Sequence, residues 1–176
     1  MQSNAMKEDG AAYPRQRIFG VFLVVTAAGL YAAVAFPYQG APNGALFGVF
    51  YGVSLFGVML NPFARKKFSA GTATARQRLA SNLSLAFLAL GVVLIFTLAS
   101  GLRTVWLSLL MVVGLHFFGF VPVHGKLVGI LGLLLCVNAV AGLGIGSLSL
   151  TTLFIVDATL KLAAGAVYLK FGPFDW

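Results

Sequence analysis

The chain has 176 residues, of which 60% are hydrophobic and 9% charged, and its formal net charge is +8. A soluble domain averages about 45–50% apolar and about 25% charged residues, so this composition excludes a soluble globular domain and a disordered chain. The basic residues lie at the ends of apolar stretches rather than along one surface stripe, so we expect no nucleic-acid partner. The composition predicts an all-α, polytopic membrane protein.

A bilayer core about 30 Å thick requires about 20 apolar residues in a helix. Six stretches meet this requirement: Arg17–Phe36, Asn43–Phe63, Leu79–Ser100, Leu102–Pro122, Leu127–Gly146 and Leu148–Leu169. Proline, glycine and asparagine separate them, and the weakest break is the glycine-rich run between the last two. Because these two stretches together would form a helix about 64 Å long, we predict two crossings and a bundle of six helices.

The domain organisation follows from these spans. Residues 1–16 are expected to be a vector-derived leader, up to Ala5, followed by a polar tail. Residues 17–171 form the six-span domain with a basic loop at 64–80, and residues 172–176 form a C-terminal tail. The segment after the first span, Phe36-Pro37-Tyr38, is weakly similar to Phe120-Val121-Pro122 at the end of the fourth. Two inverted three-helix halves are therefore one option for the architecture.

Lysine and arginine are distributed asymmetrically about the six spans. With the N-terminus inside, ten basic residues face the cytoplasm and only Arg103 faces out; the ten are Lys7, Arg15, Arg17, Arg65, Lys66, Lys67, Arg76, Arg78, Lys126 and Lys170. Cytoplasmic loops of membrane proteins carry this excess. We therefore predict a multi-pass protein of the bacterial inner membrane with both termini in the cytoplasm.

The basic loop contains Arg65, Lys66, Lys67, Arg76 and Arg78 and no acidic residue. Such a cluster fixes topology, and it also fits contact with anionic lipids, each basic residue contributing about 1 kcal/mol near an anionic surface. We expect the bilayer, and its anionic lipids, to be a partner. A homo-oligomer is a further option.

The second span carries Gly44, Gly48 and Gly52 at intervals of four residues, so all three lie on one helix face. Small residues let helices approach closely in a membrane, where lipid and side chain are equally apolar. We expect this face to pack tightly against another helix.

Four strongly polar residues lie deep in the predicted spans: His116, Asn138, Asp157 and Lys161. Ionisable groups at such depth cost about 2.5–3.5 kcal/mol each and normally face protein or water beside a partner. Asp157 and Lys161 are four residues apart, so they can pair on one helix face. The pair is then either structural, or part of a polar pocket between spans four, five and six that also holds His116 and Asn138.

Three further polar residues, Thr26, Tyr51 and Ser54, fall at similar depth and could line the same pocket. Histidine changes charge near neutral pH, and aspartate carries protons in membrane relays. His116 and Asp157 are therefore candidates for a proton relay.

The sequence lacks the motifs of nucleophilic hydrolases, zinc proteases and phosphate-binding loops. Its single cysteine, Cys136, excludes an intramolecular disulfide and a cysteine-based zinc site. We expect no metal and no cofactor, and a membrane enzyme ranks third among the function classes, behind the two compared below.

The segment Gly114-Leu115-His116-Phe117 resembles a Gly-Leu-His-Phe pattern in small, uncharacterised bacterial membrane proteins of several spans. The resemblance implies a multi-span bacterial protein and assigns no activity or ligand.

Two functions compete on this evidence. The first is binding or transport of a small solute through a polar intramembrane pocket, linked to protons through Asp157 or His116. The alternative is a lipid-binding or membrane-assembly protein without transport, in which the buried polar groups only hold helices together. A cavity open to water at one side favours the first, and a groove open sideways to lipid favours the second.

Overall fold

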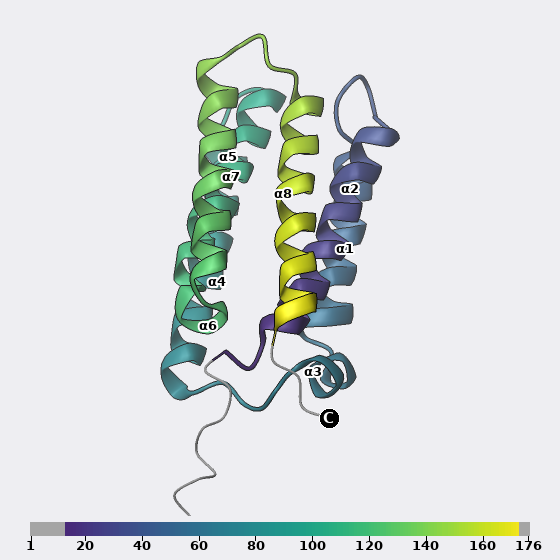
Figure 1. The fold of residues 1–176 in the computed structure, drawn as a ribbon. Coiled ribbons are helices and arrows are strands. Elements are labelled where there is room, and N and C mark those ends of the chain that lie inside the picture. The colour runs from purple at the N-terminus through teal and green to yellow at the C-terminus, as the bar shows by residue number, and fades with distance from the viewer. Residues whose placement is uncertain (1–12, 173–176) are drawn as a thin grey trace, which may run out of the picture.

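The computed structural model describes residues 13–172, and all regular elements in this range are helices, so the predicted all-α class is confirmed (Figure 1). The predicted leader, residues 1–12 and residues 173–176 lie outside the described range. In chain order the elements are α1 (Gln16–Ala35), α2 (Gly44–Gly52), the π-helix η1 (Val53–Met59), α3 (Pro62–Phe68), α4 (Ala75–Leu98), α5 (Leu102–Gly119), α6 (Val121–His124), α7 (Lys126–Gly144) and α8 (Leu150–Phe171).

Five of these helices are long and apolar enough to cross a membrane: α1, α4, α5, α7 and α8. A sixth crossing is formed if α2 and η1 count together with α3, which follows them after a bend of 67°. The weakest break of the sequence is real, because α7 ends at Gly144 and α8 begins only at Leu150. The chain is therefore a bundle of five or six spans.

The second span ends earlier than the sequence suggests. Asn61 accepts hydrogen bonds from the amides of Phe63 and Ala64, and Pro62 occupies the first turn, so a new helix, α3, starts there. The interval 64–80 was predicted as a loop, but the structure places part of it in α3 and its end in α4. Both helix starts are capped, since Thr74 and Gln77 form a capping box at α4.

The most extensive helix contacts join α1 to α8 and α5 to α7. Glycines permit them: a Cβ on Gly20 would lie 3.0 Å from the carbonyl oxygen of Gly165, and a Cβ on Gly132 only 2.7 Å from that of Gly114. The helices α2 and η1 pack on α1, whereas α4 packs on α5 and α6. Neither α2 nor η1 packs extensively on α4, which leaves the second and third spans apart.

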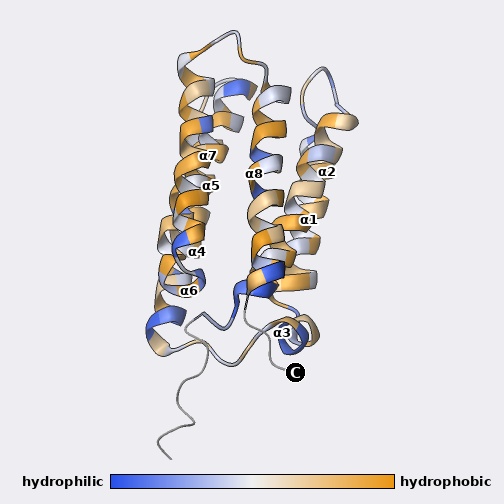
Figure 2. Cartoon of the chain, in the orientation of Figure 1, coloured by the Kyte–Doolittle hydropathy of each residue, from blue (hydrophilic) through white to orange (hydrophobic). Residues whose placement is uncertain are grey.

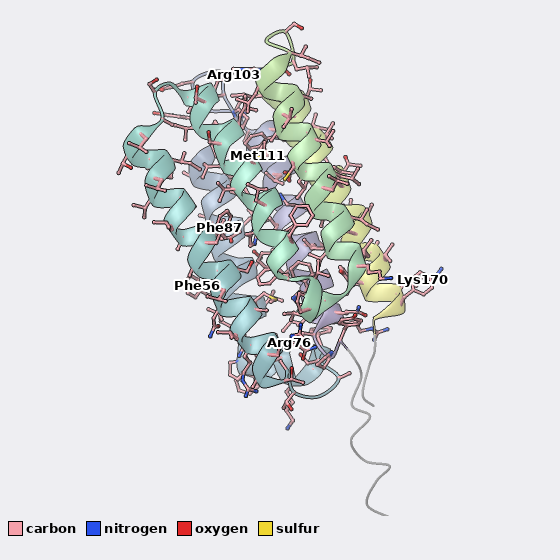
Figure 3. The ribbon with its side chains drawn as sticks, turned by 90° about the vertical axis from the view of Figure 1, so that its left-hand side faces the viewer. Phe56, Arg76, Phe87, Arg103, Met111 and Lys170 are labelled. Carbon is pink, nitrogen blue, oxygen red and sulfur yellow. The ribbon has the colours of Figure 1, made fainter. Side chains whose placement is uncertain are left out.

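The two ends of the bundle differ in charge. Figure 2 shows hydrophobic colour along the spans and hydrophilic positions gathered at the end that holds α3 and α6. Arg76 and Lys170 lie at this end, whereas Arg103 lies at the other (Figure 3). Nine of the ten basic residues that the sequence assigns to one side of the bilayer lie in the described range, and they share this end; the tenth, Lys7, lies outside that range.

Candidate functional site

The two charged residues inside the membrane lie on the same face of α8. Lys161 donates a hydrogen bond to Oδ1 of Asp157, and both side chains are buried. Their spacing of four residues brings them together within one helix, as the sequence suggests. An unpaired charge at this depth is costly, and pairing within α8 lowers the free energy of burying both charges.

The second oxygen of Asp157 is not satisfied. Its Oδ2 is buried and has no hydrogen-bond partner among the described residues. Asn138, from α7, donates from Nδ2 to the carbonyl oxygen of Leu153, 2.9 Å away and one helical turn before Asp157. Asn138 therefore ties α7 to α8 beside the charged pair.

His116 is buried on α5. Its Nδ1 lies 2.6 Å from the carbonyl oxygen of Val113, so Nδ1 carries the proton and Nε2 is left as an acceptor. The backbone carbonyl of His116 accepts a hydrogen bond from the hydroxyl of Ser84, which links α4 to α5.

The residues Thr26, Ser54 and Tyr51 join the first two spans. The hydroxyls of Thr26 and Ser54 lie 3.1 Å apart, and the hydroxyl of Ser54 lies 2.8 Å from the carbonyl oxygen of Tyr51. Ser54 is the only buried residue of the π-helix η1. A π-helix is wider than an α-helix, and short π-helical segments such as η1 often occur at functional sites.

The predicted glycine packing face on the second span is wrong for two of its three members. A Cβ on Gly44 would lie 3.2 Å from the ring of Trp106, but a Cβ on Gly48 or Gly52 would meet nothing within 4 Å. The glycines at close helix contacts are others, including Gly114 and Gly132. Spacing places Gly44, Gly48 and Gly52 on one face but does not say that a helix lies opposite.

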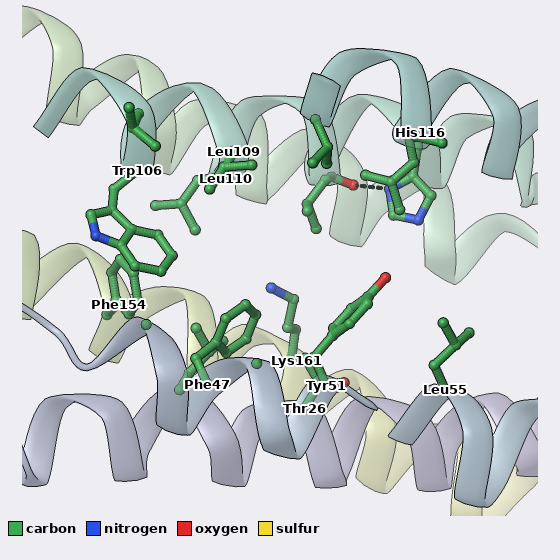
Figure 4. A pocket seen from close by; sticks show the side chains of 18 of the residues that line it. Thr26, Phe47, Tyr51, Leu55, Trp106, Leu109, Leu110, His116, Phe154 and Lys161 are labelled. Carbon is green, nitrogen blue, oxygen red and sulfur yellow. Dashed lines mark hydrogen bonds between the residues drawn. The ribbon is translucent and has the colours of Figure 1, made fainter. Parts of the chain in front are cut away.

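Gly48 instead faces a cavity of about 830 Å³ between α1, α2, η1, α4, α5 and α8 (Figure 4). Four polar residues line it, namely Thr26, Tyr51, His116 and Lys161, and the rest of the wall is apolar. Asp157 and Asn138 do not line it, and neither does any residue of α7. The cavity thus differs in its walls from the pocket expected between spans four, five and six, because it includes His116 and Lys161 but neither Asn138 nor Asp157.

Aromatic rings form the wall on one side of Lys161. The rings of Trp106 and Phe154 meet edge to face with centroids 4.9 Å apart, and Phe47 meets Trp106 at 6.2 Å. In Figure 4 the Nζ atom of Lys161 points into the space between this group and Tyr51. One amine therefore projects into a largely apolar, aromatic cavity.

The cavity is open at the side of the bundle. It lies where α2 and η1 fail to pack on α4, and several of its lining residues are exposed, including Gly48, Leu85 and Phe96. These positions lie within the spans and are apolar, so the opening faces the depth at which the bilayer is hydrocarbon.

The five basic residues of the predicted lipid contact do not lie at the cavity. Arg65 donates from Nε to the carbonyl oxygen of Met59 at 2.6 Å, and Arg78 donates to that of Ala73 at 2.6 Å. Lys66, Lys67 and Arg76 are exposed. Arg65 and Arg78 thus also bind backbone carbonyls, one at the end of η1 and one in the loop between α3 and α4.

Arg103, which sequence analysis treated only as the outer exception, has a structural role. Its guanidinium donates to the carbonyl oxygens of Gly142, at 2.7 Å, and Leu148, at 2.8 Å. These carbonyls belong to the end of α7 and to the loop before α8, where a cation also suits the helix dipole. The sequence offered no local signal for this contact, because Arg103 and Gly142 are 39 residues apart.

His124 is a second residue whose role the sequence did not reveal. It is buried, stacks on Phe19 with ring centroids 4.1 Å apart, and its carbonyl oxygen accepts hydrogen bonds from Gln16 and Tyr168. Burial, and then the nearby charge of Arg15, lowers the pKa of His124 to about 3. His124 joins α6 to α1 and α8 as a neutral core residue.

The chain belongs to DUF6609, a family of unknown function whose model matches residues 6–173. This agrees with the resemblance to uncharacterised membrane proteins found from the Gly-Leu-His-Phe segment. Comparison with curated proteins and with solved structures gives no match.

Proposed function

We propose that this member of the DUF6609 family binds a largely apolar, membrane-soluble ligand in the cavity beside Lys161. The observation that carries the proposal is the cavity itself, which is apolar, opens sideways and has one amine in its wall. Of the two functions that the sequence left in competition, this geometry favours the lipid-type binder.

The size of the cavity supports a ligand with one chain. Its volume falls within the roughly 300–1,000 Å³ of small-molecule sites. It follows α5 from Leu102 to Phe117, which is about 22 Å of helix. One leaflet of a bilayer core is about 15 Å thick, so an acyl or isoprenoid chain fits along this length.

The amine of Lys161 sets the polar requirement on the ligand. An ammonium has three N–H donors, and Asp157 accepts one of them. The remaining donors face an apolar cavity, where an unsatisfied polar group is costly. A ligand with an acceptor oxygen at mid-depth satisfies this requirement, whereas a plain hydrocarbon does not.

Fluorescence of Trp106 tests the proposal. The second tryptophan is removed by Trp176→Phe, and the protein in detergent is titrated with a fatty alcohol brominated in mid-chain, which quenches on contact. We expect saturable quenching that the unbrominated alcohol reverses. Gly48→Leu, which places a bulky side chain inside the cavity, should weaken it strongly, and Gly52→Leu is the matched control because Gly52 faces open space but does not line the cavity. Quenching that never saturates, or that Gly48→Leu leaves unchanged, would refute the proposal.

Solute transport stays a second candidate, favoured by the pattern of helix contacts. The first three spans are α1, α2 with η1, and α4, and the last three are α5, α7 and α8. The first span contacts the second and the sixth, and in the same way the fourth span contacts the fifth and the third. Inverted halves related in this way are common in transporters. The second and third spans break this pattern, because they do not pack on each other as the fifth and sixth spans do. The cavity lies between them. Uptake of a solute by vesicles, dependent on a proton gradient and lost in Asp157→Asn, is the result that would establish it.

We also propose that the basic end faces the cytoplasm of a bacterial inner membrane and contacts anionic lipids there. The supporting observation is the gathering of basic residues at one end of the described bundle. A Thr72→Cys variant on a Cys136→Ser background tests the orientation. An impermeant thiol reagent outside intact cells should not label it, and labelling would reverse the topology.

A further inference from the structure

We infer that Lys161 captures its ligand covalently, because its amine is placed to condense with an apolar aldehyde in the cavity and form a protonated imine beside Asp157. This rests on the proposed function, since the aldehyde has to occupy the same cavity.

Lys161 differs from the other described lysines in its surroundings. It is buried and lines the cavity, whereas Lys66, Lys67, Lys126 and Lys170 are exposed. Lysines that serve as nucleophiles toward carbonyl groups are typically desolvated in apolar sites. The Nζ atom also faces empty space rather than a neighbouring helix, so a ligand carbon has room to reach it.

Asp157 supplies what the condensation needs. The ammonium of Lys161 passes one proton to the carboxylate that it already contacts, and the lone pair on Nζ attacks the carbonyl carbon. One N–H proton then moves to the former carbonyl oxygen, which gives the neutral carbinolamine. The carbinolamine then takes the proton back on its hydroxyl group and loses water, which leaves a protonated carbon–nitrogen double bond. Overall, an aldehyde and an ammonium become an iminium and water, and no oxidant or reductant is required.

The electrostatics of the site are the same before and after this step. The iminium carries the single positive charge that the ammonium carried, so Asp157 remains its counterion and the buried pair stays neutral overall. Buried charges inside membranes commonly serve as counterions to a bound ligand. The Oδ2 atom of Asp157, which has no partner among the described residues, is available to the iminium N–H or to the departing water.

The walls of the cavity indicate the class of aldehyde. On one side of Lys161, Phe154 lies two helical turns earlier on the same helix, and its ring contacts Trp106. Phe47 closes the same side. Flat rings of this kind pack best on a flat, conjugated chain. We therefore assign the site to a long-chain, conjugated aldehyde whose chain runs from Nζ toward Trp106.

The experiment uses retinal as a conjugated aldehyde probe and retinol as its matched probe without the carbonyl. The Trp176→Phe protein is incubated with each in detergent, treated with borohydride to reduce any imine to a stable amine, and mapped by peptide mass spectrometry. We expect a retinyl adduct concentrated at Lys161, a red-shifted absorbance before reduction, and no adduct from retinol. The exposed lysines are the internal control for random reaction.

Two variants separate the alternatives. Lys161→Arg keeps the ion pair and should lose the adduct, and Gly48→Leu keeps Lys161 and should reduce the adduct because the new side chain occupies part of the cavity. If both probes quench Trp106 saturably but no adduct forms at Lys161, or the adduct is spread evenly over the exposed lysines, the covalent inference is wrong and the proposed binding function stands. If neither probe quenches Trp106 saturably, the proposed function fails as well.

Discussion

The same substitution, glycine to alanine, should have opposite effects at Gly132 and at Gly48. Gly132 is buried between α5 and α7, and its added Cβ would lie 2.7 Å from the carbonyl oxygen of Gly114. Gly48 faces the cavity, and its added Cβ would meet nothing within 4 Å. One position tests helix packing and the other tests the cavity.

The magnitudes follow from these distances. Ordinary contact begins at 3.4 Å, so Gly132→Ala requires the two backbones to separate by about 0.7 Å. Overpacking of this kind costs about 1–3 kcal/mol. Alanine gains up to about 1 kcal/mol over glycine in a helix. We therefore expect Gly132→Ala to lower the free energy of unfolding by up to about 2 kcal/mol and Gly48→Ala to raise it by up to about 1 kcal/mol.

The assay is denaturation of the purified protein in detergent, followed by circular dichroism, with both variants measured beside the unchanged protein. Gly52→Ala serves as a second open position and should behave like Gly48→Ala. If Gly48→Ala destabilises the protein as much as Gly132→Ala, a helix packs against the second span and the lateral opening does not exist.

Three other predictions concern buried polar groups. Asp157→Asn should cost about 3–5 kcal/mol because it leaves Lys161 unpaired, while Asp157→Asn with Lys161→Met should restore most of that loss; equal stability of the single and double variants would contradict this. Arg103→Gln should cost about 1.5–3 kcal/mol by freeing carbonyls around the end of α7, which detergent denaturation would measure against Lys66→Gln as a surface control. The pKa of His124 is 6.5 in the unfolded chain and about 3 in the folded protein, so between these pH values only the unfolded chain binds the proton. The stability that His124 contributes above pH 6.5 is therefore lost as the pH falls through this window, by up to about 1.4 kcal/mol per pH unit. His124→Phe should flatten this part of the stability profile, and an unchanged profile would show that His124 does not stay neutral.

Much of the fold could be predicted from the sequence because the bilayer imposes strong local rules. The length of each apolar stretch sets the number of crossings, and proline, glycine and asparagine at their ends set the breaks. The pairing of Asp157 with Lys161 was also predictable, since residues four apart in one helix are neighbours on the same face, whatever packs around the helix. These relations depend only on helix geometry.

Relations between helices were not predictable in the same way. In a soluble protein the polar face of a helix marks its outside, but spans such as α7 are apolar all round, so composition does not show which face meets a neighbour. Gly48 and Gly132 are therefore alike in sequence, yet one lines a cavity and the other touches a backbone.

By itself, then, the sequence determined an all-α membrane protein, the approximate positions of five of its spans, the concentration of its basic residues, and the charged pair on the last helix. Only the tertiary structure decided that His124 is a core residue and that the chain bends after η1 and continues as a separate helix, α3. It also decided that Lys161 faces an apolar cavity while Asp157 does not. The physical reason is that a cavity exists where two helices fail to meet, and that is a property of their arrangement rather than of either helix.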